Sequence, residues 1–322
     1  MVERLDSVTL ESGAVIAPVD VTYTDYGPRD APVVVVHHAL TGDADSIDWW
    51  DTLVGPGRPV DTNRFRVICS NLLGGCKGTT GPSSIDPSTG EPYGLTFPLF
   101  TIRDLVTVQR ALLRELGVAK VHAAIGGSLG GMQALQWSLD HPEEVERAVL
   151  ICCTARLTAQ NIAFTKVARE AIMRYDSMDV ARMMAHITYL SVESMAMKFD
   201  RARRVPDAPM SFDSDFEVEH YLDHQARIFL ARFDPLTYIY LSRVMDYFEP
   251  FAEHSGTPST DYLLVSFDSD WRFGTEHSEY IEEALRERGA SVARHEVRSP
   301  WGHDSFLMDV PEYHALVREF LA

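Results

Sequence analysis

The stretch GGSLGG, residues 126–131, decides how the rest of this sequence is interpreted. It follows VHAAI (121–125), a short apolar run typical of a buried strand, and it precedes MQALQW (132–137), which has helical character. A strand, a glycine-flanked serine and a helix form the G-x-S-x-G pattern of a nucleophile elbow, here centred on Ser128. Such a sharp turn brings neighbouring chain close to the serine, so its flanking positions must lack a Cβ atom. The pattern also occurs by chance in a plain glycine-rich turn, so the rest of the chain has to decide between the two.

Composition and charge limit the classes of partner. The chain has 322 residues, of which 45% are hydrophobic, and this allows one large core with an inserted or appended unit. Its net charge of -18 is opposite in sign to that of a basic surface that binds nucleic acid. The sequence also has no polybasic segment that could bind anionic lipid, and no apolar run long enough to span a membrane. We therefore expect neither nucleic acid nor a membrane as a partner, and a few well-placed cations must meet any anionic substrate.

The N-terminus and the cysteines indicate the compartment. Residues 1–6 have no basic stretch followed by an apolar one, so we expect no signal peptide. The four cysteines, Cys69, Cys76, Cys152 and Cys153, form no C-x-x-C pair, and the last two should point to opposite faces of a strand. We expect reduced thiols in a cytoplasmic protein. Cys76 is an alternative nucleophile, but nothing near it in the sequence marks it as activated.

Strand-like and helix-like segments alternate along most of the chain. Strands are expected at residues 19–26, 33–38, 65–69, 121–125, 149–153, 262–267 and 292–297, and helices after Thr101, after the elbow, at 276–288 and at 311–320. Thr101 and Asp104 have the spacing of a capping box, and Gly117 is placed to end that helix. Short connections between strands and helices predict an α/β fold with a mostly parallel sheet and helices on both faces.

One block departs from this alternation. From about residue 155 to 251 the pattern is helical, and eight of the chain's eleven methionines lie there. Methionine adapts to irregular apolar surfaces and interfaces. We therefore divide the chain into a catalytic core, residues 1–154 and 251–322, and an inserted helical cap, residues 155–250, which covers the active site and contributes to self-association.

Partners for the elbow serine are sought late in the chain. In a fold with this elbow the order is serine, then an acid after a late strand, then a histidine after the last strand. His303 is so placed, and the strand ending at Phe267 offers both Asp268 and Asp270. Asp270 reaches further into the loop, whereas Asp268 could cap it, so spacing favours Asp270 and leaves both open.

Other histidines carry less information. His220 and His224 have the i,i+4 spacing of metal ligands but lie in an acidic helix without an H-E-x-x-H motif. A solvated surface explains them better, and no metal site is predicted.

Five blocks occur in one order along the chain: NLLGGCKGTTGPSS (71–84), GGSLGGMQALQW (126–137), ARMMAHITYLS (181–191), SFDSDWRF (266–273) and GHDSFL (302–307). Together they resemble the homoserine O-acetyltransferase family of α/β-hydrolase-fold acyltransferases, from about Val19 to the C-terminus. The resemblance implies an α/β-hydrolase fold, transfer of an acyl group from acyl-CoA to L-homoserine in methionine biosynthesis, and a cytoplasmic homodimer joined through the cap. Acyl-CoA is then a co-substrate, and no cofactor is expected.

The resemblance also assigns catalytic residues. It makes Ser128 the nucleophile, Asp270 the acid and His303 the base of a Ser-His-Asp triad. The backbone N–H groups of Leu40 and Leu129 are expected to hold the oxyanion.

Substrate contacts follow from the same blocks. Arg182 and Tyr189 match the family's homoserine-binding arginine and tyrosine, and their spacing of seven residues places them on one helix face. Asp304 resembles the partner of the homoserine ammonium group. Arg272 resembles the arginine of members that use succinyl-CoA, which favours succinyl-CoA over acetyl-CoA as donor. A serine esterase, or an acyltransferase for another alcohol, remains the alternative. The segment between the elbow helix and Arg182 is shorter than in many family members. We expect this difference to change the shape of the cap and not the triad.

Overall fold

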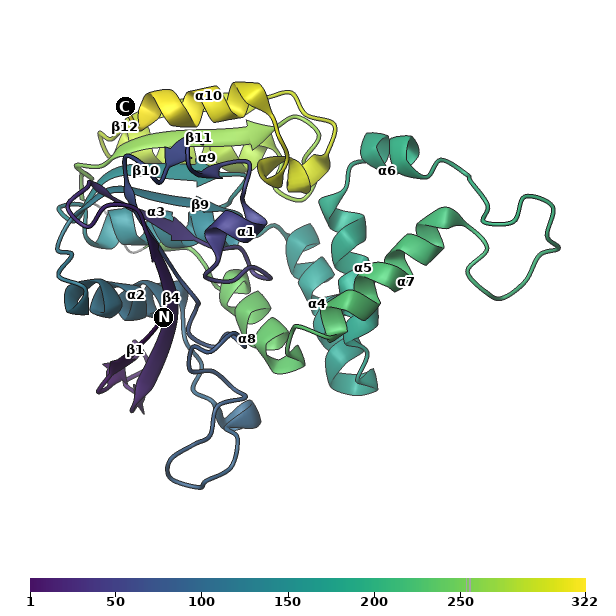
Figure 1. Ribbon diagram of the computed structural model, residues 1–322, viewed down its shortest axis with the longest axis horizontal. Coiled ribbons are helices and arrows are strands. Elements are labelled where there is room, and N and C mark those ends of the chain that lie inside the picture. Colours follow the sequence, from purple (N-terminus) through teal and green to yellow (C-terminus); the bar gives the residue numbers. More distant parts are fainter. Residues whose placement is uncertain (253, 255) are drawn as a thin grey trace.

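The computed structural model describes residues 1–252, 254 and 256–322, and its centre is a twisted eight-stranded sheet (Figure 1). The strand order is β1-β4-β8-β5-β9-β10-β11-β12, and the pairs from β8 to β12 are parallel, whereas β4 runs antiparallel to both of its neighbours. The strands of this sheet are β1 (Val2–Leu5), β4 (Val19–Tyr26), β5 (Val33–His37), β8 (Arg66–Ser70), β9 (Val121–Gly127), β10 (Val145–Ile151), β11 (Asp261–Phe267) and β12 (Ser291–Val297).

The helices and the minor strands complete the architecture. The helices are α1 (Ser46–Trp49), α2 (Ile102–Glu115), α3 (Leu129–Asp140), α4 (Ala159–Tyr175), α5 (Met178–Tyr189), α6 (Val192–Lys198), α7 (Glu217–Leu230), α8 (Pro235–Asp246), α9 (Thr275–Glu287) and α10 (Pro311–Phe320). Three short 3-10 turns are η1 (Gly94–Thr96), η2 (Pro250–Ala252) and η3 (Gly302–Leu307). Two small sheets pair β2 (Val8–Thr9) with β3 (Val15–Ile16) and β6 (Val54–Gly55) with β7 (Val60–Asp61).

Helices cover both faces of the large sheet, as its central strands require. In β5, Val35 packs into one hydrophobic cluster while Val34 and Val36 pack into another on the opposite face. The first cluster also contains side chains of α2, α3 and α9, and the second contains Trp50 and side chains of α10. A strand that is buried on both faces must be apolar throughout, which explains the run of four valines. The predicted α/β fold, with a mostly parallel sheet, is confirmed.

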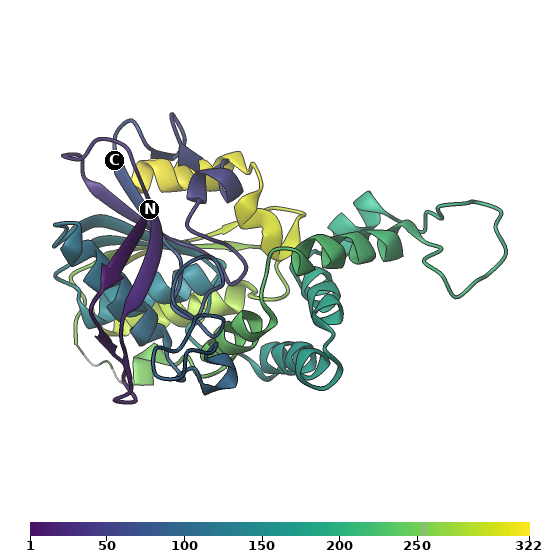
Figure 2. The same cartoon turned by 60° about the horizontal axis from the view of Figure 1, so that its bottom comes forward.

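Five helices, α4 to α8, lie between β10 and β11 in the chain. In Figures 1 and 2, α4 to α7 stand to one side of the sheet, and the segment between α6 and α7 reaches farthest from the core. Helix α8 lies nearest the core, where Tyr240 Oη donates to the carbonyl of Phe97 (2.7 Å) and Leu241 joins the cluster that contains α2 and α3. None of the described helices is both long and apolar enough to cross a lipid bilayer.

The end of β10 differs from the prediction. The strand was expected to include Cys152 and Cys153 but ends at Ile151, because Cys152 has a φ of 35°, which no regular strand adopts. The two side chains still separate as expected, with Cys152 in the α10 cluster and Cys153 in the α3 cluster. All four cysteines are unpaired.

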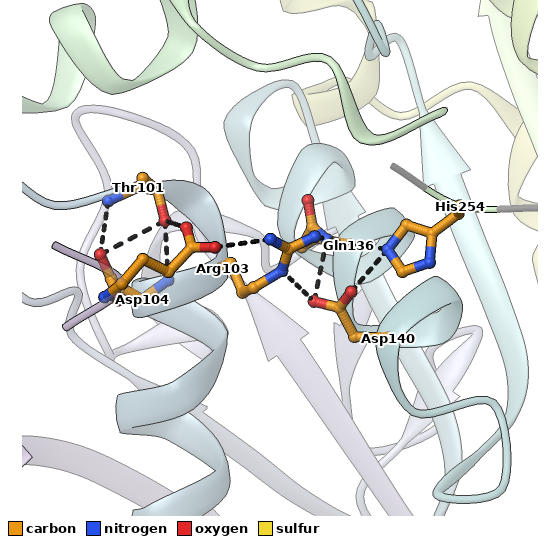
Figure 3. Close-up of polar contacts among 7 residues, drawn as sticks. Thr101, Arg103, Asp104, Gln136, Asp140 and His254 are labelled. Atoms are coloured by element: carbon orange, nitrogen blue, oxygen red, sulfur yellow. Dashed lines mark hydrogen bonds and ion pairs between the residues drawn. The ribbon is translucent and has the colours of Figure 1, made fainter. Parts of the chain in front are cut away.

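A polar network holds the helix that follows the elbow (Figure 3). The α2 capping box is present as predicted, with Asp104 accepting from the backbone of Thr101 (2.9 Å). From the same helix Arg103 donates to Asp140 at the end of α3 (2.9 Å), and His254 pairs with that carboxylate at 2.6 Å. The network therefore connects α2, the C-terminal end of α3 and His254.

Candidate active site

Ser128 occupies the sharp turn between β9 and α3. Its backbone has φ 56° and ψ -124°, a left-handed conformation that non-glycine residues adopt only at a cost. A Cβ atom on Gly126 would lie 2.1 Å from the carbonyl carbon of Gly130, and one on Gly130 would lie 2.1 Å from the carbonyl oxygen of His37. Both flanking glycines are therefore needed for the turn, and the G-x-S-x-G pattern is a structural elbow rather than a chance match.

The structure brings the predicted acid and base together, whereas no hydrogen bond joins Ser128 Oγ to His303 among the described residues. His303 Nδ1 lies 2.7 Å from Asp270 Oδ2, and both side chains are almost completely buried. The other oxygen, Asp270 Oδ1, accepts the backbone N–H groups of Arg272 and Phe273 at 2.9 Å each. The carboxylate is thus fixed by three contacts, and it orients the imidazole so that Nε2 is free for a proton transfer.

The alternative acid has a different task. Asp268 Oδ1 accepts the backbone N–H of Ser299 (2.9 Å) and so holds the loop that follows β12. Nearby, Ser269 Oγ donates to the carbonyl of Ser299 and accepts the N–H of Gly302 (3.0 Å). Geometry, unlike spacing, separates the two aspartates: Asp270 contacts His303 and Asp268 positions its loop.

Aromatic rings enclose the imidazole of His303. The ring of Phe273 contacts it edge-on with centroids 5.2 Å apart, and those of Phe306 and Tyr189 lie at 5.8 Å. Tyr189 belongs to α5, so one wall of the site comes from the helical insertion. Gly302 has a φ of 69° and passes so close to Tyr189 that a Cβ atom would lie 2.6 Å from the Tyr189 carbonyl oxygen. The glycine therefore permits the close approach of α5 to the base.

Two backbone N–H groups are available at the elbow. The amide of Leu129 begins α3, and that of Leu40 lies in the loop after β5; neither donates to a protein acceptor among the residues that the structure describes. Gln133 Nε2 donates to the Leu129 carbonyl (3.2 Å) and approaches the carbonyl of His38 (3.5 Å), which connects the loop to α3. Free donors at a helix N-terminus favour a developing negative charge, so the arrangement suits an oxyanion hole.

Of the predicted homoserine-binding residues, Tyr189 contacts the base directly, Asp304 follows it in the chain, and Arg182 lies on the same helix as Tyr189. Arg182 Nε and Nη1 are buried and have no hydrogen-bond partner in the described parts of the chain, and the guanidinium lies 4.3 Å over the ring of Phe229. Burial raises the pKa of the Asp304 carboxyl, while the charges of His303 and Arg182 act against this shift. Buried donors without partners cost about 1–3 kcal/mol each, so Arg182 is positioned for a ligand rather than for the free protein.

Arg272 is a buried cation beside the acid. Its side chain is 8% exposed, its Nη1 donates to Thr188 Oγ1 (3.0 Å), and its guanidinium lies over the ring of Tyr189 at 5.5 Å. No Asp or Glu within residues 1–252, 254 and 256–322 forms an ion pair with it. A buried guanidinium that is held only by a hydroxyl and π systems retains most of its capacity to bind an anion.

Sequence reasoning did not identify the second layer around Arg182. His186 of α5 and Tyr221 of α7 form a hydrogen bond of 3.0 Å between Nδ1 and Oη. Burial first, and then the charges of Arg182 and Lys198, lower the pKa of His186 to about 3, so this imidazole is neutral. His186 belongs to the ARMMAHITYLS block and could have been suspected, whereas nothing in the sequence around Tyr221 marks it.

One buried group could in principle hold a metal ion. Potential ligand atoms of Cys152, Asp270 and His303 lie within 4.8 Å of one another. However, burial raises the pKa of the Cys152 thiol well above its usual range, and the other two residues already share a hydrogen bond. The set therefore fits a protonated thiol beside an acid–base pair better than a metal site. His220 and His224 instead interact with Arg204 and Arg227.

Comparison with known proteins places this site in a family. The model of the alpha/beta hydrolase fold matches residues 32–310. A homoserine O-succinyltransferase of Nocardioides sp. (strain ATCC BAA-499 / JS614) is 47% identical over 98% of this chain and 95% of its own length. A homoserine O-acetyltransferase of Rhodopseudomonas palustris (strain BisB18) is 44% identical over 97% and 87%, respectively.

Comparison with a solved structure supports the fold but says nothing about the reaction. The crystal structure of esterase E22 superposes over 100% of this chain and 99% of its own, with a TM-score of 0.88 at 24% identity. This likeness shows the fold alone, and the much higher sequence identity to the two acyltransferases decides the family. The chain belongs to the homoserine O-acyltransferases of the α/β-hydrolase fold.

Proposed function

We propose that the protein transfers an acyl group from acyl-CoA to the side-chain hydroxyl of L-homoserine. The full-length similarity to two homoserine acyltransferases carries this proposal, and the elbow serine and the Asp270–His303 pair support it. The test is steady-state thiol release from acetyl-CoA and succinyl-CoA, each with and without L-homoserine. Thiol release that depends on homoserine supports the proposal, whereas homoserine-independent release with free acid as product indicates an esterase.

The geometry supports a two-step mechanism. His303 Nε2 takes the proton of Ser128 Oγ while the oxygen attacks the thioester carbonyl, whose oxyanion is held by the N–H groups of Leu40 and Leu129. One such donor typically contributes about 3–4 kcal/mol to transition-state stabilisation. The carbon–sulfur bond breaks, and His303 protonates the departing thiolate, which leaves an acyl-serine. The homoserine hydroxyl then gives its proton to His303 and attacks the acyl-serine. The bond between the acyl carbon and Ser128 Oγ breaks, and His303 returns the proton to Oγ. Acyl-CoA is therefore a co-substrate, and the kinetics are ping-pong.

Transfer must be faster than hydrolysis of the acyl-serine. A well-oriented hydroxyl reaches an effective molarity of about 10⁵–10⁸ M, far above that of water. Arg182 would bind the acceptor carboxylate, Asp304 its ammonium group, and Tyr189 would fix it against His303. Positioning by these three residues is sufficient to favour transfer.

The acceptor site can be tested through its arginine. Arg182→Gln should raise the KM for homoserine about 10- to 100-fold, because a charge-assisted contact of about 1.5–3 kcal/mol is lost, and should change the KM for acyl-CoA much less. The exposed Arg174 of α4, paired with Glu170, provides the matched control Arg174→Gln. An unchanged homoserine KM in Arg182→Gln would remove this residue from the acceptor site.

Arg272 supports succinyl-CoA as the preferred donor. A succinyl group has a distal carboxylate that this buried and unpaired guanidinium could hold, whereas an acetyl group offers it nothing. Both donor names occur among close relatives, so similarity alone leaves the choice open.

The donor assignment predicts a change in preference. In Arg272→Leu, kcat/KM for succinyl-CoA should fall about 10- to 100-fold relative to that for acetyl-CoA, which is the effect of removing one charge-assisted hydrogen bond from a buried site. Acetyl-CoA serves as the internal control, because both donors use the same triad. An unchanged ratio of the two kcat/KM values means that Arg272 does not select the donor.

Self-association through the cap is also part of the proposal. The helical insertion presents exposed apolar side chains, including Val192, Val205, Met210 and Phe212, which support a homodimer contact there. Sedimentation equilibrium distinguishes a dimer from a monomer. The four unpaired cysteines support the expected cytoplasmic compartment.

A further inference from the structure

A second arginine shares the aromatic ring that supports Arg182. The guanidinium of Arg232, which follows α7, lies 5.2 Å from the ring centroid of Phe229, and that of Arg182 lies 4.3 Å from the same centroid. Phe233 stacks on this ring with centroids 4.8 Å apart. Two cations are thus gathered on one small aromatic platform beside the active site.

Neither arginine is in direct contact with a carboxylate among the described residues, although the charges of Asp304 and Asp43 act on Arg182 and Arg232 at longer range. In the parts of the chain that the structure describes, no carboxylate forms an ion pair with Arg182 or Arg232, although most other arginines of this acidic chain are paired. Arg232 itself is an exposed residue, and its partial enclosure, and next the charge of Arg182, lower its pKa. The free protein therefore holds two like charges on one aromatic ring, and a bound anion would reduce their repulsion.

The position of Arg232 connects this platform to the catalytic centre. Its Nη1 donates to the carbonyl oxygen of Thr41 (3.2 Å), and Thr41 directly follows Leu40 in the loop after β5. Arg182 comes from α5, whose last residue, Tyr189, contacts His303. Arg232 is thus tied to the loop that carries Leu40, and Arg182 lies on the helix that carries Tyr189.

We propose that Arg232 and Arg182 together form one anion-binding site over Phe229, which holds a carboxylate or phosphate group of a bound substrate. Guanidinium groups are suited to both, because their planar donors match the oxygens of either anion. Within the proposed function the source is the carboxylate of the amino-acid acceptor or a phosphate of acyl-CoA. The proposal rests on that function only for the identity of the two substrates.

The test compares Arg232→Gln and Arg232→Lys with the control Arg227→Gln. Arg227 lies on α7, is exposed, and contacts only His224 among the described residues. KM and kcat are measured for homoserine, for acyl-CoA and for the matching acyl-N-acetylcysteamine thioester, which has no phosphate. We expect Arg232→Gln to raise one KM about 10- to 100-fold with little change in kcat, and Arg232→Lys to recover part of the loss.

The pattern of KM values identifies the source of the anion. A higher KM for homoserine with both donors indicates the acceptor carboxylate. A higher KM for acyl-CoA, but not for the phosphate-free thioester, indicates a phosphate. A lower kcat with every donor and unchanged KM values would overturn the proposal, because Arg232 would then only position the oxyanion loop through Thr41. Unchanged kinetics would overturn it as well.

A binding measurement separates failure of this site from failure of the proposed function. Calorimetric titration of homoserine and of free CoA into wild type and Arg232→Gln needs no turnover, so it applies even if the acceptor of the reaction differs. Loss of affinity for one of them in the variant supports the anion site. Removal of a like charge should also leave the melting temperature of the free variant at or above that of the wild type, whereas a purely structural arginine would lower it.

Discussion

Replacing Ser128 with alanine is expected to lower kcat for homoserine-dependent thiol release by at least about 10⁴-fold, and toward 10⁶-fold if the triad acts as a unit. The reason is the covalent step. Ser128 is the side chain presented by the left-handed turn between β9 and α3, next to the free N–H of Leu129. Without its oxygen no acyl-enzyme forms, and only binding and the oxyanion donors remain to assist direct attack.

The matched control is Cys76→Ala, since Cys76 is the alternative nucleophile. Its thiol is partly exposed and its side chain packs against the α2–α3 cluster, so its removal should leave kcat within about twofold, which is usual for a substitution away from the reacting atoms. Intact-protein mass spectrometry after mixing with acyl-CoA alone should show an acyl adduct in the wild type and in Cys76→Ala, but none in Ser128→Ala. An adduct that persists in Ser128→Ala and disappears in Cys76→Ala would exchange the two roles.

The sequence predicts the central strands of the sheet well, because a strand that is buried on both faces is a run of apolar residues. Strand β5 begins with four valines in a row, and β4 and α10 have the predicted bounds. The signal is weakest where structure depends on single backbone angles. β10 ends two residues before the predicted end because Cys152 has a positive φ, and no pattern of side chains predicts that backbone angle. The two-residue strands β2, β3, β6 and β7 are too short for any periodicity to show.

The candidate site is predictable to the extent that it lies in short local motifs. Ser128 and Leu129 are fixed by the elbow itself, and His303 by the position of its loop. Spacing alone leaves Asp268 and Asp270 open, because both follow the same strand. The family resemblance selects Asp270, and the hydrogen bonds of the loop show that this aspartate faces the base.

The contacts between α5 and α7 could not be predicted from the sequence. Tyr221 and Arg232 come to the site because α7 packs on α5. That packing depends on the shapes of many side chains rather than on any one motif. Their neighbours in the sequence are ordinary helical residues, so neither residue stands out until the two helices are placed together.

The two aspartates provide the second large prediction. Asp270→Asn should lower kcat about 10⁴-fold, the loss typical of an amide in place of the triad acid, while Asp268→Asn should retain activity within about twofold. In Asp270→Asn the amide oxygen can still accept the N–H groups of Arg272 and Phe273. Its NH₂ group then faces His303 Nδ1 as a donor.

This reversal of the hydrogen bond explains the size of the effect. A donor at Nδ1 selects the tautomer whose proton is on Nε2, and that nitrogen can then no longer accept the proton of Ser128. In Asp268→Asn, by contrast, the amide oxygen can keep its bond from the N–H of Ser299, so the His303 loop stays in place. Single-turnover kinetics of acyl-enzyme formation, with circular dichroism to confirm folding, measure both variants. Loss of the acylation step in Asp268→Asn with retention in Asp270→Asn would make Asp268 the triad acid, and the loop would then have to rearrange in solution.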